Sequence, residues 1–290
     1  MNSSSCRQSD LVAVSIKTHG RPESLRACIA SVEAYLGSPY RLYITDDSPP
    51  GETDEALLAK LESKGHFIRR YPQITPVTIA RNEHVENTQG EAFLLRMDDD
   101  FELSPEFNLP AMLSILGEHT YLGALSSIER QAIAGRGTVS QGISPHQGYL
   151  ICRERVLHKL SVPLDAWQWL GRSFQPRLSI ADHTRNCLLL RMSVFSDVRW
   201  NEGLYFHGEH EAFMLDLKKA GWLLAFTPDS IHLHNESRSS YPGYSLVKQR
   251  EASRKAMANV FEQEYGIERI ELTYPAGKYL ESMDEHRGTP

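Results

Sequence analysis

The sequence predicts an α/β fold with a mostly parallel central sheet flanked by helices. Apolar, β-rich runs alternate with helix-periodic segments through the first hundred residues, and proline and glycine mark helix ends. The first run, Leu11 to Ile16, is almost continuously apolar, as strands buried on both faces are. With 290 residues, 41% of them hydrophobic and 23% charged, the chain fits one main domain better than two independent folds.

The elements of the first half follow in a regular order. A strand over Leu11 to Ile16 leads into a helix that begins at Pro22, where a first-turn proline loses no hydrogen bond, and ends at Gly37. Further elements are a strand over Tyr40 to Ser48, a capped helix over Thr53 to Gly65, a strand over His66 to Tyr71 and a strand from Phe93 that runs into three aspartates.

The second half is less regular. Helical spacing predicts helices over Glu106 to Leu116, within Gly208 to Trp222 and over Leu246 to Tyr265. Short apolar runs predict strands over Tyr121 to Leu125, Tyr149 to Cys152, Cys187 to Met192, Trp222 to Phe226 and Ser230 to Asn235. The polar end of the chain is expected to be disordered.

Composition excludes several classes of function. A net charge of -6 disfavours a nucleic-acid partner, because there is no basic excess to neutralise a phosphate backbone. The four cysteines are scattered without zinc-type spacing, which favours a reducing compartment. No segment approaches 18 consecutive apolar residues and no signal peptide is evident, so we expect a soluble, cytoplasmic protein without a transmembrane segment.

Three consecutive aspartates, Asp98 to Asp100, end the fourth predicted strand. In open α/β sheets ligands bind at the carboxyl ends of the strands, where Asp98 and Asp100 would project together. Two carboxylates so close repel each other unless a cation intervenes, and a hard divalent ion that carries a diphosphate is the usual solution. The alternative is a solvated acidic turn or a helix cap.

Three further segments place polar groups near the same predicted edge. Asp46 and Asp47 end the second strand, where carboxylates can accept hydrogen bonds from a base or a ribose, or can simply form a turn before Pro49. Arg21 follows the first strand and can pair with a base or phosphate, although a surface ion pair is the alternative. The Ala80 to Asn82 segment precedes the aspartate-ended strand and is otherwise an ordinary amphipathic stretch.

Taken in order, these segments resemble the GT-A glycosyltransferases of family 2. The resemblance rests on the loop from Thr18 to Arg21, the Asp46 strand end, the A-R-N segment, the D-x-D at Asp98, and a G-Y-like pair followed by a distal histidine. It covers about Leu11 to Asn235. It implies a GT-A, Rossmann-like sheet, a nucleotide-diphosphate sugar as donor, Mn²⁺ or Mg²⁺ as cofactor, and a carbohydrate or glycan acceptor.

The resemblance also implies roles for individual residues. The residues that it places at the nucleotide are Thr18, Arg21, Asp46, Asp47, Arg81, Asp98 and Asp99. The residues that it places at the metal are Asp98, Asp100 and His234. The spacing agrees for the last of these, because His232 and His234 alternate and therefore share one strand face; a zinc site built on this pair is disfavoured, since no matching thiolates or further histidines accompany it.

One position departs from the family pattern. Counted back from Gly221 and Trp222, the pair that is normally Glu-Asp falls on Glu209 and His210, so histidine occupies the position of the usual catalytic aspartate. Inverting transfer needs a general base to take the proton of the acceptor hydroxyl. We favour Glu209 or Glu211 as this base with His210 assisting, and the sequence does not order them. The alternative is an acidic first helical turn that complements the helix dipole.

The predicted organisation has four parts. Residues 1–10 form a flexible N-terminus, 11–104 the nucleotide-binding half and 105–235 the acceptor-binding half of the GT-A domain, and 236–290 a flexible loop with a C-terminal helical extension. We expect the loop to close on the donor and to place Arg238 against the diphosphate. A plain surface linker is the alternative.

The expected function is therefore metal-dependent, inverting transfer of a hexosyl or N-acetylhexosaminyl group from a nucleotide-diphosphate sugar, with UDP as the expected nucleotide, in polysaccharide or glycan synthesis. A sugar-phosphate nucleotidyltransferase is one alternative, but its glycine-rich loop is missing, since the loop after the first strand has a single glycine. A non-catalytic module that binds nucleotide sugars is the other alternative, and His210 keeps it open.

Overall fold

The structure is a computed structural model and describes residues 11–133, 140–143, 147–162, 177–235 and 247–273. The predicted flexible N-terminus, most of the predicted loop with Arg238, and the polar C-terminal end lie outside the described residues. In the described part of the chain, no helix is both long enough and apolar enough to cross a bilayer.

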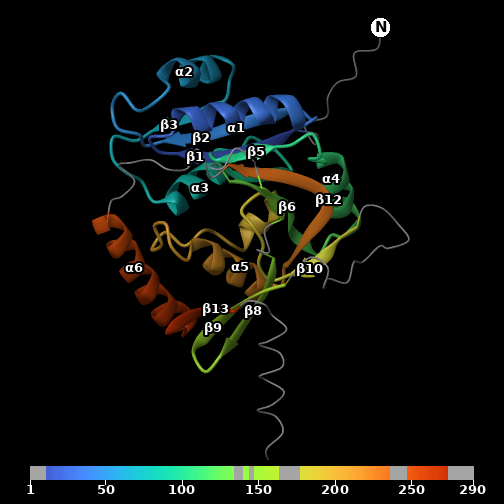
Figure 1. Cartoon of the computed structure of the whole chain (residues 1–290), viewed down its shortest axis with the longest axis vertical. Coiled ribbons are helices and arrows are strands. Elements are labelled where there is room, and N and C mark those ends of the chain that lie inside the picture. The colour runs from blue at the N-terminus through green and yellow to red at the C-terminus, as the bar shows by residue number, and fades with distance from the viewer. Residues whose placement is uncertain (1–10, 134–139, 144–146, 163–176, 236–246, 274–290) are drawn as a thin grey trace, which may run out of the picture.

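The first half contains the elements β1 (Val12–Thr18), α1 (Pro22–Tyr35), β2 (Tyr40–Asp46), α2 (Glu55–Ser63), β3 (Phe67–Arg70), α3 (Val77–Glu86), β4 (Phe93–Asp98), β5 (Phe101–Leu103) and α4 (Leu109–Glu118). The second half contains β6 (Leu122–Ile133), β7 (Ser140–Ile143), β8 (Gly148–Arg153), β9 (Val156–Ser161), β10 (Ser179–Ala181), β11 (Leu188–Arg191), a 3-10 helix η3 (Met192–Ser196), α5 (Glu209–Lys219), β12 (Leu223–Asn235), α6 (Val247–Tyr265) and β13 (Arg269–Thr273). Figure 1 shows these elements along the chain.

The large sheet has the order β10-β12-β6-β11-β4-β1-β2-β3, with β5 paired to β12 and β7 to β6. Strands β4, β1, β2 and β3 are parallel, and β11 runs antiparallel between β4 and β6. In this register Lys17 pairs with Asp98, and Thr18 pairs with Asp46. The predicted parallel half therefore brings the ends of three strands to one edge, as ligand sites in open α/β sheets require.

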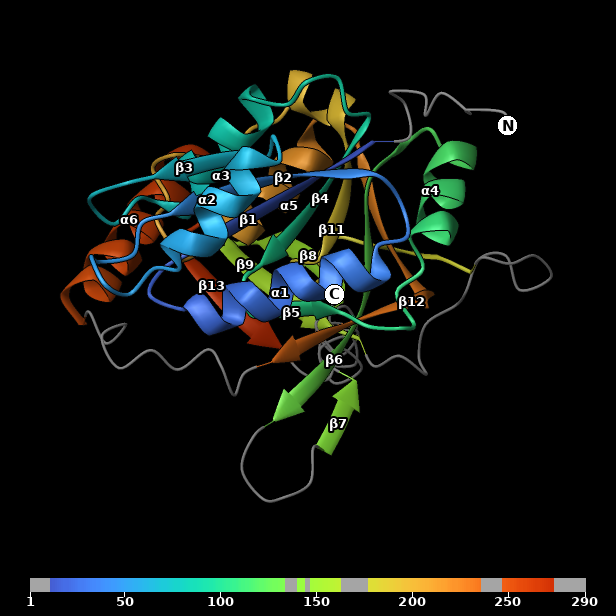
Figure 2. The same cartoon turned by 90° about the horizontal axis from the view of Figure 1, so that it is seen from above.

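Two apolar layers lie between the sheet and its helices, one on each face of the sheet. On one face, Val12 and Val14 pack with α1, α2 and α4, whereas the intervening Ala13 faces the opposite layer, as the period of two in a strand requires. Figure 1 shows α1 and α2 on one side of the sheet and α3 and α5 on the other, and Figure 2 looks down on the α1 side. The sheet is thus covered on both faces, which explains why β1 is almost wholly apolar.

The C-terminal elements belong to the second of these layers. Phe261 of α6 is buried with Phe213 of α5 and with Trp200. The rings of Phe213 and Trp200 stack on each other with a centroid distance of 4.5 Å. Strand β13 adds to β9 and β8 to form a separate three-stranded sheet. The predicted helical extension is therefore packed against the main domain through α6.

Several boundaries differ from those predicted. The two predicted strands around Pro228 form one strand, β12, which continues past the proline through a register shift between Thr227 and Ile231. The A-R-N segment lies inside helix α3. Helix α4 begins at Leu109, not at Glu106, because the Asn108 side chain accepts a hydrogen bond from Ala111 N and caps the first turn.

Because α6 is part of the core, substitution of Phe261 is expected to act like a substitution inside the domain. Phe261 is 2% exposed, so Phe261→Ala is expected to lower the free energy of unfolding by about 3–5 kcal/mol, measured by urea denaturation. Leu272→Ala is the control, since that side chain is 78% exposed. An equal, small effect of both substitutions would contradict the packed position of α6.

Candidate functional site

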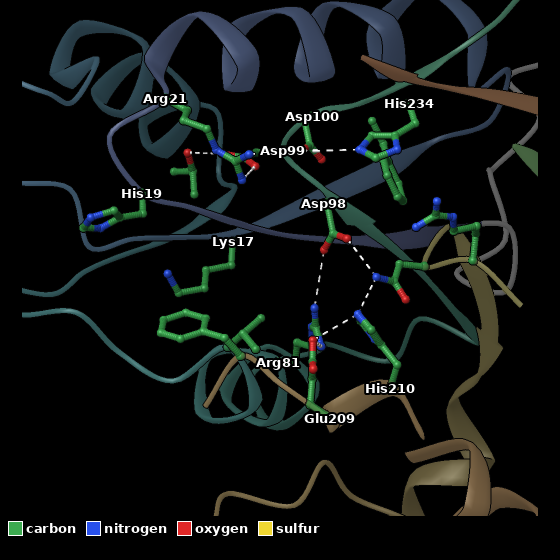
Figure 3. A pocket seen from close by; sticks show the side chains of 16 residues that line it. Lys17, His19, Arg21, Arg81, Asp98, Asp99, Asp100, Glu209, His210 and His234 are labelled. Carbon is green, nitrogen blue, oxygen red and sulfur yellow. Dashed lines mark hydrogen bonds and ion pairs between the residues drawn. The ribbon is translucent and has the colours of Figure 1, made fainter. Parts of the chain in front are cut away.

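A cavity of about 340 Å³ opens at the carboxyl ends of β1 and β4. The loop after β1, the start of α5 and the end of β12 complete its walls, as Figure 3 shows. The lining residues are Lys17, Thr18, His19, Arg21, Val77, Arg81, Asp98, Asp99, Asp100, Phe101, Arg185, Asn186, Phe206, Glu209, His210 and His234. The cavity therefore contains most of the residues that the sequence pattern predicted.

Asp98 is surrounded by donors of this chain. Its Oδ1 accepts from Arg96 Nη2 at 2.8 Å and lies 3.4 Å from Arg81 Nη2, and its Oδ2 accepts from Asn186 Nδ2 at 3.0 Å. Burial alone would raise the pKa of Asp98, but Arg96 and Arg81 outweigh burial and lower it to about 2. Asp98 is therefore a fully ionised carboxylate in a fixed orientation.

Asp99 points away from Asp98 and is bound from the β1 side. Thr18 Oγ1 donates to Asp99 Oδ2 at 2.6 Å, and Arg21 Nη2 donates to Asp99 Oδ1. Burial raises the pKa of Asp99 to about 7, Arg21 opposes that shift, and the neighbouring Asp100 adds to it. The Arg21 guanidinium also donates to Asp100 Oδ2 at 2.9 Å, so it bridges two of the three aspartates.

Asp100 lies beside the histidine at the end of β12. His234 Nε2 is 3.7 Å from Asp100 Oδ2, and His234 Nδ1 is 3.6 Å from Glu129 Oε1 on β6. Burial lowers the pKa of His234, but the two carboxylates outweigh it and raise the pKa to about 9. Asp100 and His234 are far apart in the sequence. The pairing of β5 with β12 brings them together, because it places His234 opposite Phe101.

The predicted metal ligands can be tested against this geometry. Two ligand atoms that each lie about 2.1 Å from one small divalent ion are about 3 to 4 Å apart, so Asp100 Oδ2 and His234 Nε2 fit a shared ion, which would displace a proton from Nε2. Among the described residues, no three His, Cys, Asp or Glu side chains are grouped so as to hold a metal ion. The donor set therefore fits an ion that also takes oxygen ligands from a substrate, as Mg²⁺ commonly does with phosphates.

The second pair of aspartates does not line the cavity. Asp46 accepts from Ser48 N at 2.8 Å and from the Thr53 hydroxyl, so its carboxylate forms the turn that follows β2. This geometry matches the turn that was the alternative for this strand end. A contact between Asp46 and the nucleotide stays a prediction, and the use of both carboxylate oxygens in the turn does not favour it.

Asp47 is buried behind the cavity wall. Its carboxylate lies 2.8 Å from Lys17 Nζ and 2.9 Å from His19 Nδ1, and it accepts from Thr75 N at 2.6 Å. Burial would raise the pKa of Asp47, but His19 and Lys17 outweigh it and lower the pKa. Lys17 and His19 line the cavity themselves, so Asp47 orients two of the side chains in its wall.

The first turn of α5 brings Glu209 and His210 to the opposite wall. The turn starts at Gly208, whose φ of +78° favours glycine and whose added Cβ would lie 2.7 Å from Met257 and Phe261 of α6. The packing of α6 therefore requires this glycine, and the glycine sets the direction in which α5 begins. Because α5 starts here, its first two side chains enter the cavity.

Glu209 and His210 interact with each other and with the aspartate side of the cavity. His210 Nε2 is 3.0 Å from Glu209 Oε1 and 2.5 Å from Asn186 Nδ2, the amide that also donates to Asp98. Glu209 Oε1 is 3.5 Å from Arg81 Nη1. Burial raises the pKa of Glu209 to about 7 despite Arg81, and burial together with Arg96 and Arg81 lowers the pKa of His210 well below its usual value.

Glu211 is placed differently from its two neighbours. It does not line the cavity, and its carboxylate accepts from Lys159 Nζ at 2.6 Å. Burial would raise the pKa of Glu211, but Lys159 outweighs it and lowers the pKa. A paired, ionised carboxylate outside the cavity is a poor candidate for the base. Glu209 and His210 are therefore the better candidates.

Some residues in or directly behind the cavity wall were not predicted as site residues. Arg96 carries a signal in the sequence, because it is a charged residue inside an apolar strand and lies two positions before Asp98, on the same face. Lys17 and His19 flank the predicted Thr18. Asn186 had no signal, since only the antiparallel placement of β11 beside β4 brings it to Asp98.

Comparison with known proteins gives one family and several structures. The profile of Glycosyl transferase family 2 matches residues 13–197. No curated protein sequence matches the chain. The matched region runs from β1 through β11 and contains the three aspartates, and it ends before Glu209, His210 and His234.

The similar solved structures share the fold at low identity. S. aureus TarS has a TM-score of 0.54 at 12% identity over 87% of this chain and 40% of that chain. S. aureus TarS 1–349 has a TM-score of 0.51 at 12% identity over 87% and 72%. GalNAc-T7 with UDP, GalNAc and Mn²⁺ has a TM-score of 0.62 at 15% identity over 88% and 49%. The chain thus spans less than half the length of the full TarS and GalNAc-T7 structures, and the likeness shows the GT-A fold.

Proposed function

Because the chain belongs to glycosyltransferase family 2, we propose that it transfers a sugar from a nucleotide-diphosphate sugar to an acceptor hydroxyl. The observation that carries the proposal is one cavity with the three strand-end aspartates on one wall and the Glu209–His210 pair on the other. The first wall suits a cation and a diphosphate, and the second suits proton abstraction. The expected donor is a UDP-sugar with a hexosyl or N-acetylhexosaminyl group, and the expected acceptor is a carbohydrate or glycan.

The nucleotide is proposed to bind along the edge of β1 and β4. Thr18, Arg21 and Arg81 all reach this edge. Arg81 helps to keep Asp98 ionised, and Arg21 orients Asp99 and Asp100. Lys17 lies 5.9 Å from the Phe206 ring centroid, so these two side chains form a wall with both charge and an aromatic face. Such a wall fits a nucleotide, which has a negative diphosphate and a flat base.

A divalent cation is proposed between Asp100 and His234. When bound, it would stabilise the charge that develops on the leaving diphosphate. GalNAc-T7 binds UDP and Mn²⁺ in its structure, which supports the same cofactor here. Asp98 was predicted as a third ligand; because Arg96, Arg81 and Asn186 already bind its two oxygens, we assign it chiefly to orienting this edge.

The proton of the acceptor hydroxyl is proposed to go to His210 Nε2. In the tautomer with Nδ1 protonated, Nε2 carries the lone pair, and the Asn186 amide beside this nitrogen gives up the contact when the acceptor hydroxyl delivers its proton. Once protonated, Nε2 faces Glu209 Oε1 at 3.0 Å, so the carboxylate stabilises the imidazolium. A base opposite the departing diphosphate corresponds to inversion at the anomeric carbon.

His210 variants test this assignment. His210→Asn is expected to lower kcat by about 10²- to 10⁴-fold with little change in KM for the donor, because only the transfer step loses its base. His210→Asp restores the carboxylate of the family pattern and is expected to recover part of kcat. Nucleotide release from a UDP-sugar in the presence of an acceptor is the assay, and His119→Asn, a surface histidine bonded to Tyr121, is the matched control.

The pH dependence separates the two candidate bases. His210 has a pKa below its ordinary value of 6.5, so its neutral form persists and wild-type kcat should fall only as the pH drops below about 6.5. Glu209, with a pKa of about 7, would instead impose a fall through pH 7. A fall near pH 7 in the wild type, with activity lost in Glu209→Gln and retained in His210→Asn, would assign the base to Glu209.

Removal of the cation site is expected to abolish turnover. Chelation by EDTA should stop nucleotide release and Mn²⁺ should restore it, and Asp100→Asn should lower kcat by about 100-fold or more, since a bound cation contributes several kcal/mol of charge stabilisation. A screen of UDP- and GDP-sugars provides the assay and also identifies the donor.

Asp229→Asn is the matched control for Asp100→Asn. The Asp229 side chain is 15% exposed and pairs with Arg177, as the 11% exposed Asp100 pairs with Arg21, but Asp229 lies outside the cavity. Full turnover after chelation or in Asp100→Asn would contradict the metal role. Donor binding without any nucleotide release would favour the non-catalytic alternative.

A further inference from the structure

A buried carboxylate lies directly beneath the proposed cation site. Glu129 is on β6, where it pairs in register with His232 of the parallel strand β12, and it is 2% exposed. It does not line the cavity. A glutamate buried to this degree is uncommon unless charged or polar partners surround it, so its neighbours indicate what it does.

Three basic groups surround this carboxylate. Arg185 Nε is 2.9 Å from Glu129 Oε2, His232 Nε2 is 4.0 Å from the same oxygen, and His234 Nδ1 is 3.6 Å from Oε1. Within the described part of the chain, neither oxygen accepts a well-aligned hydrogen bond. The charges of these neighbours, and not a complete set of hydrogen bonds, therefore hold Glu129 in place.

The His234 ring lies between two carboxylates. Its Nε2 faces Asp100 at 3.7 Å in the cavity, and its Nδ1 faces Glu129 at 3.6 Å beneath the cavity floor. The Phe101 ring meets the imidazole edge-to-face at a centroid distance of 5.0 Å and restricts its rotation. An imidazole that gives one nitrogen to a cation commonly gives its other N–H to a carboxylate, which sets the tautomer and the ring direction.

We propose that Glu129 is a positioning residue that holds His234 with Nδ1 protonated and Nε2 free to bind the cation beside Asp100. Glu129 acts through His234 and does not touch the donor or the ion. The inference rests on the proposed metal-assisted function and adds to it a residue that lies outside the cavity and outside the family pattern given above.

Glu129→Gln tests the inference because it keeps the shape of the side chain and removes its charge. The dissociation constant of Mn²⁺ is measured in the presence of UDP by electron paramagnetic resonance, and that of UDP without metal by calorimetry. We expect Mn²⁺ binding to weaken by about 10- to 100-fold and metal-free UDP binding to stay unchanged. A merely structural role would weaken both.

Glu106→Gln is the matched control. Glu106 also pairs with an arginine, Arg130, which neighbours Glu129 on β6, but its side chain is 53% exposed and does not face His234. Mn²⁺ affinity in Glu106→Gln is expected to equal that of the wild type. Equal Mn²⁺ affinity in Glu129→Gln and in the wild type would overturn the inference and leave the proposed function intact.

A paired variant covers the case in which Glu129→Gln does not fold. Replacing both members of the buried pair, in Glu129→Gln with Arg185→Gln, avoids an uncompensated buried charge. The paired variant is compared with Arg185→Gln alone. We expect the paired variant to bind Mn²⁺ about 10- to 100-fold more weakly than Arg185→Gln does. Wild-type protein that binds no Mn²⁺ with UDP present would overturn both the cation site and the role of Glu129.

Discussion

The site depends on how three adjacent carboxylates are kept together at the end of one strand. Three arginines from this chain provide most of the compensation: Arg96 and Arg81 face Asp98, and Arg21 bridges Asp99 and Asp100. A buried carboxylate without such partners would take up a proton rather than stay charged. The edge of the sheet can therefore present negative charge to a ligand only because the loop after β1, helix α3 and strand β4 itself supply cations.

This compensation divides the aspartates into different roles. Asp98 has donors on both oxygens, and Asp99 is held by Thr18 and Arg21. Asp100 shares Arg21 but faces His234, so it is the carboxylate best placed to share a cation. The Asn186 amide contacts both Asp98 and His210, so it connects the nucleotide side of the cavity to the proposed base. The family pattern has Glu-Asp where Glu209 and His210 stand, so this chain keeps the first carboxylate and has an imidazole in place of the second.

The sequence was informative where function depends on strand ends and on local order. Parallel strands bring their carboxyl ends to one edge, so Thr18, Arg21 and Asp98 could be placed together from their positions alone, and the cavity contains them. Contacts set by tertiary pairing had no such signal: Asn186 depends on β11 running beside β4, and Glu129 on β6 pairing with β12. At two predicted positions the side chain has a local or tertiary partner that the pattern did not indicate, because the Asp46 carboxylate accepts within a turn and Glu211 accepts from Lys159, which is remote in sequence. The proline in β12 also predicted a break where the strand continues through a bulge.

The central claim is that this acidic strand end binds a cation, which in turn holds a diphosphate. The most direct measurement is anomalous X-ray diffraction from crystals of the protein grown or soaked with Mn²⁺ and UDP. The account predicts one anomalous peak within bonding distance of Asp100 and His234, with the diphosphate oxygens completing its coordination. UDP bound elsewhere, or bound in this cavity with no anomalous peak beside Asp100, would contradict it.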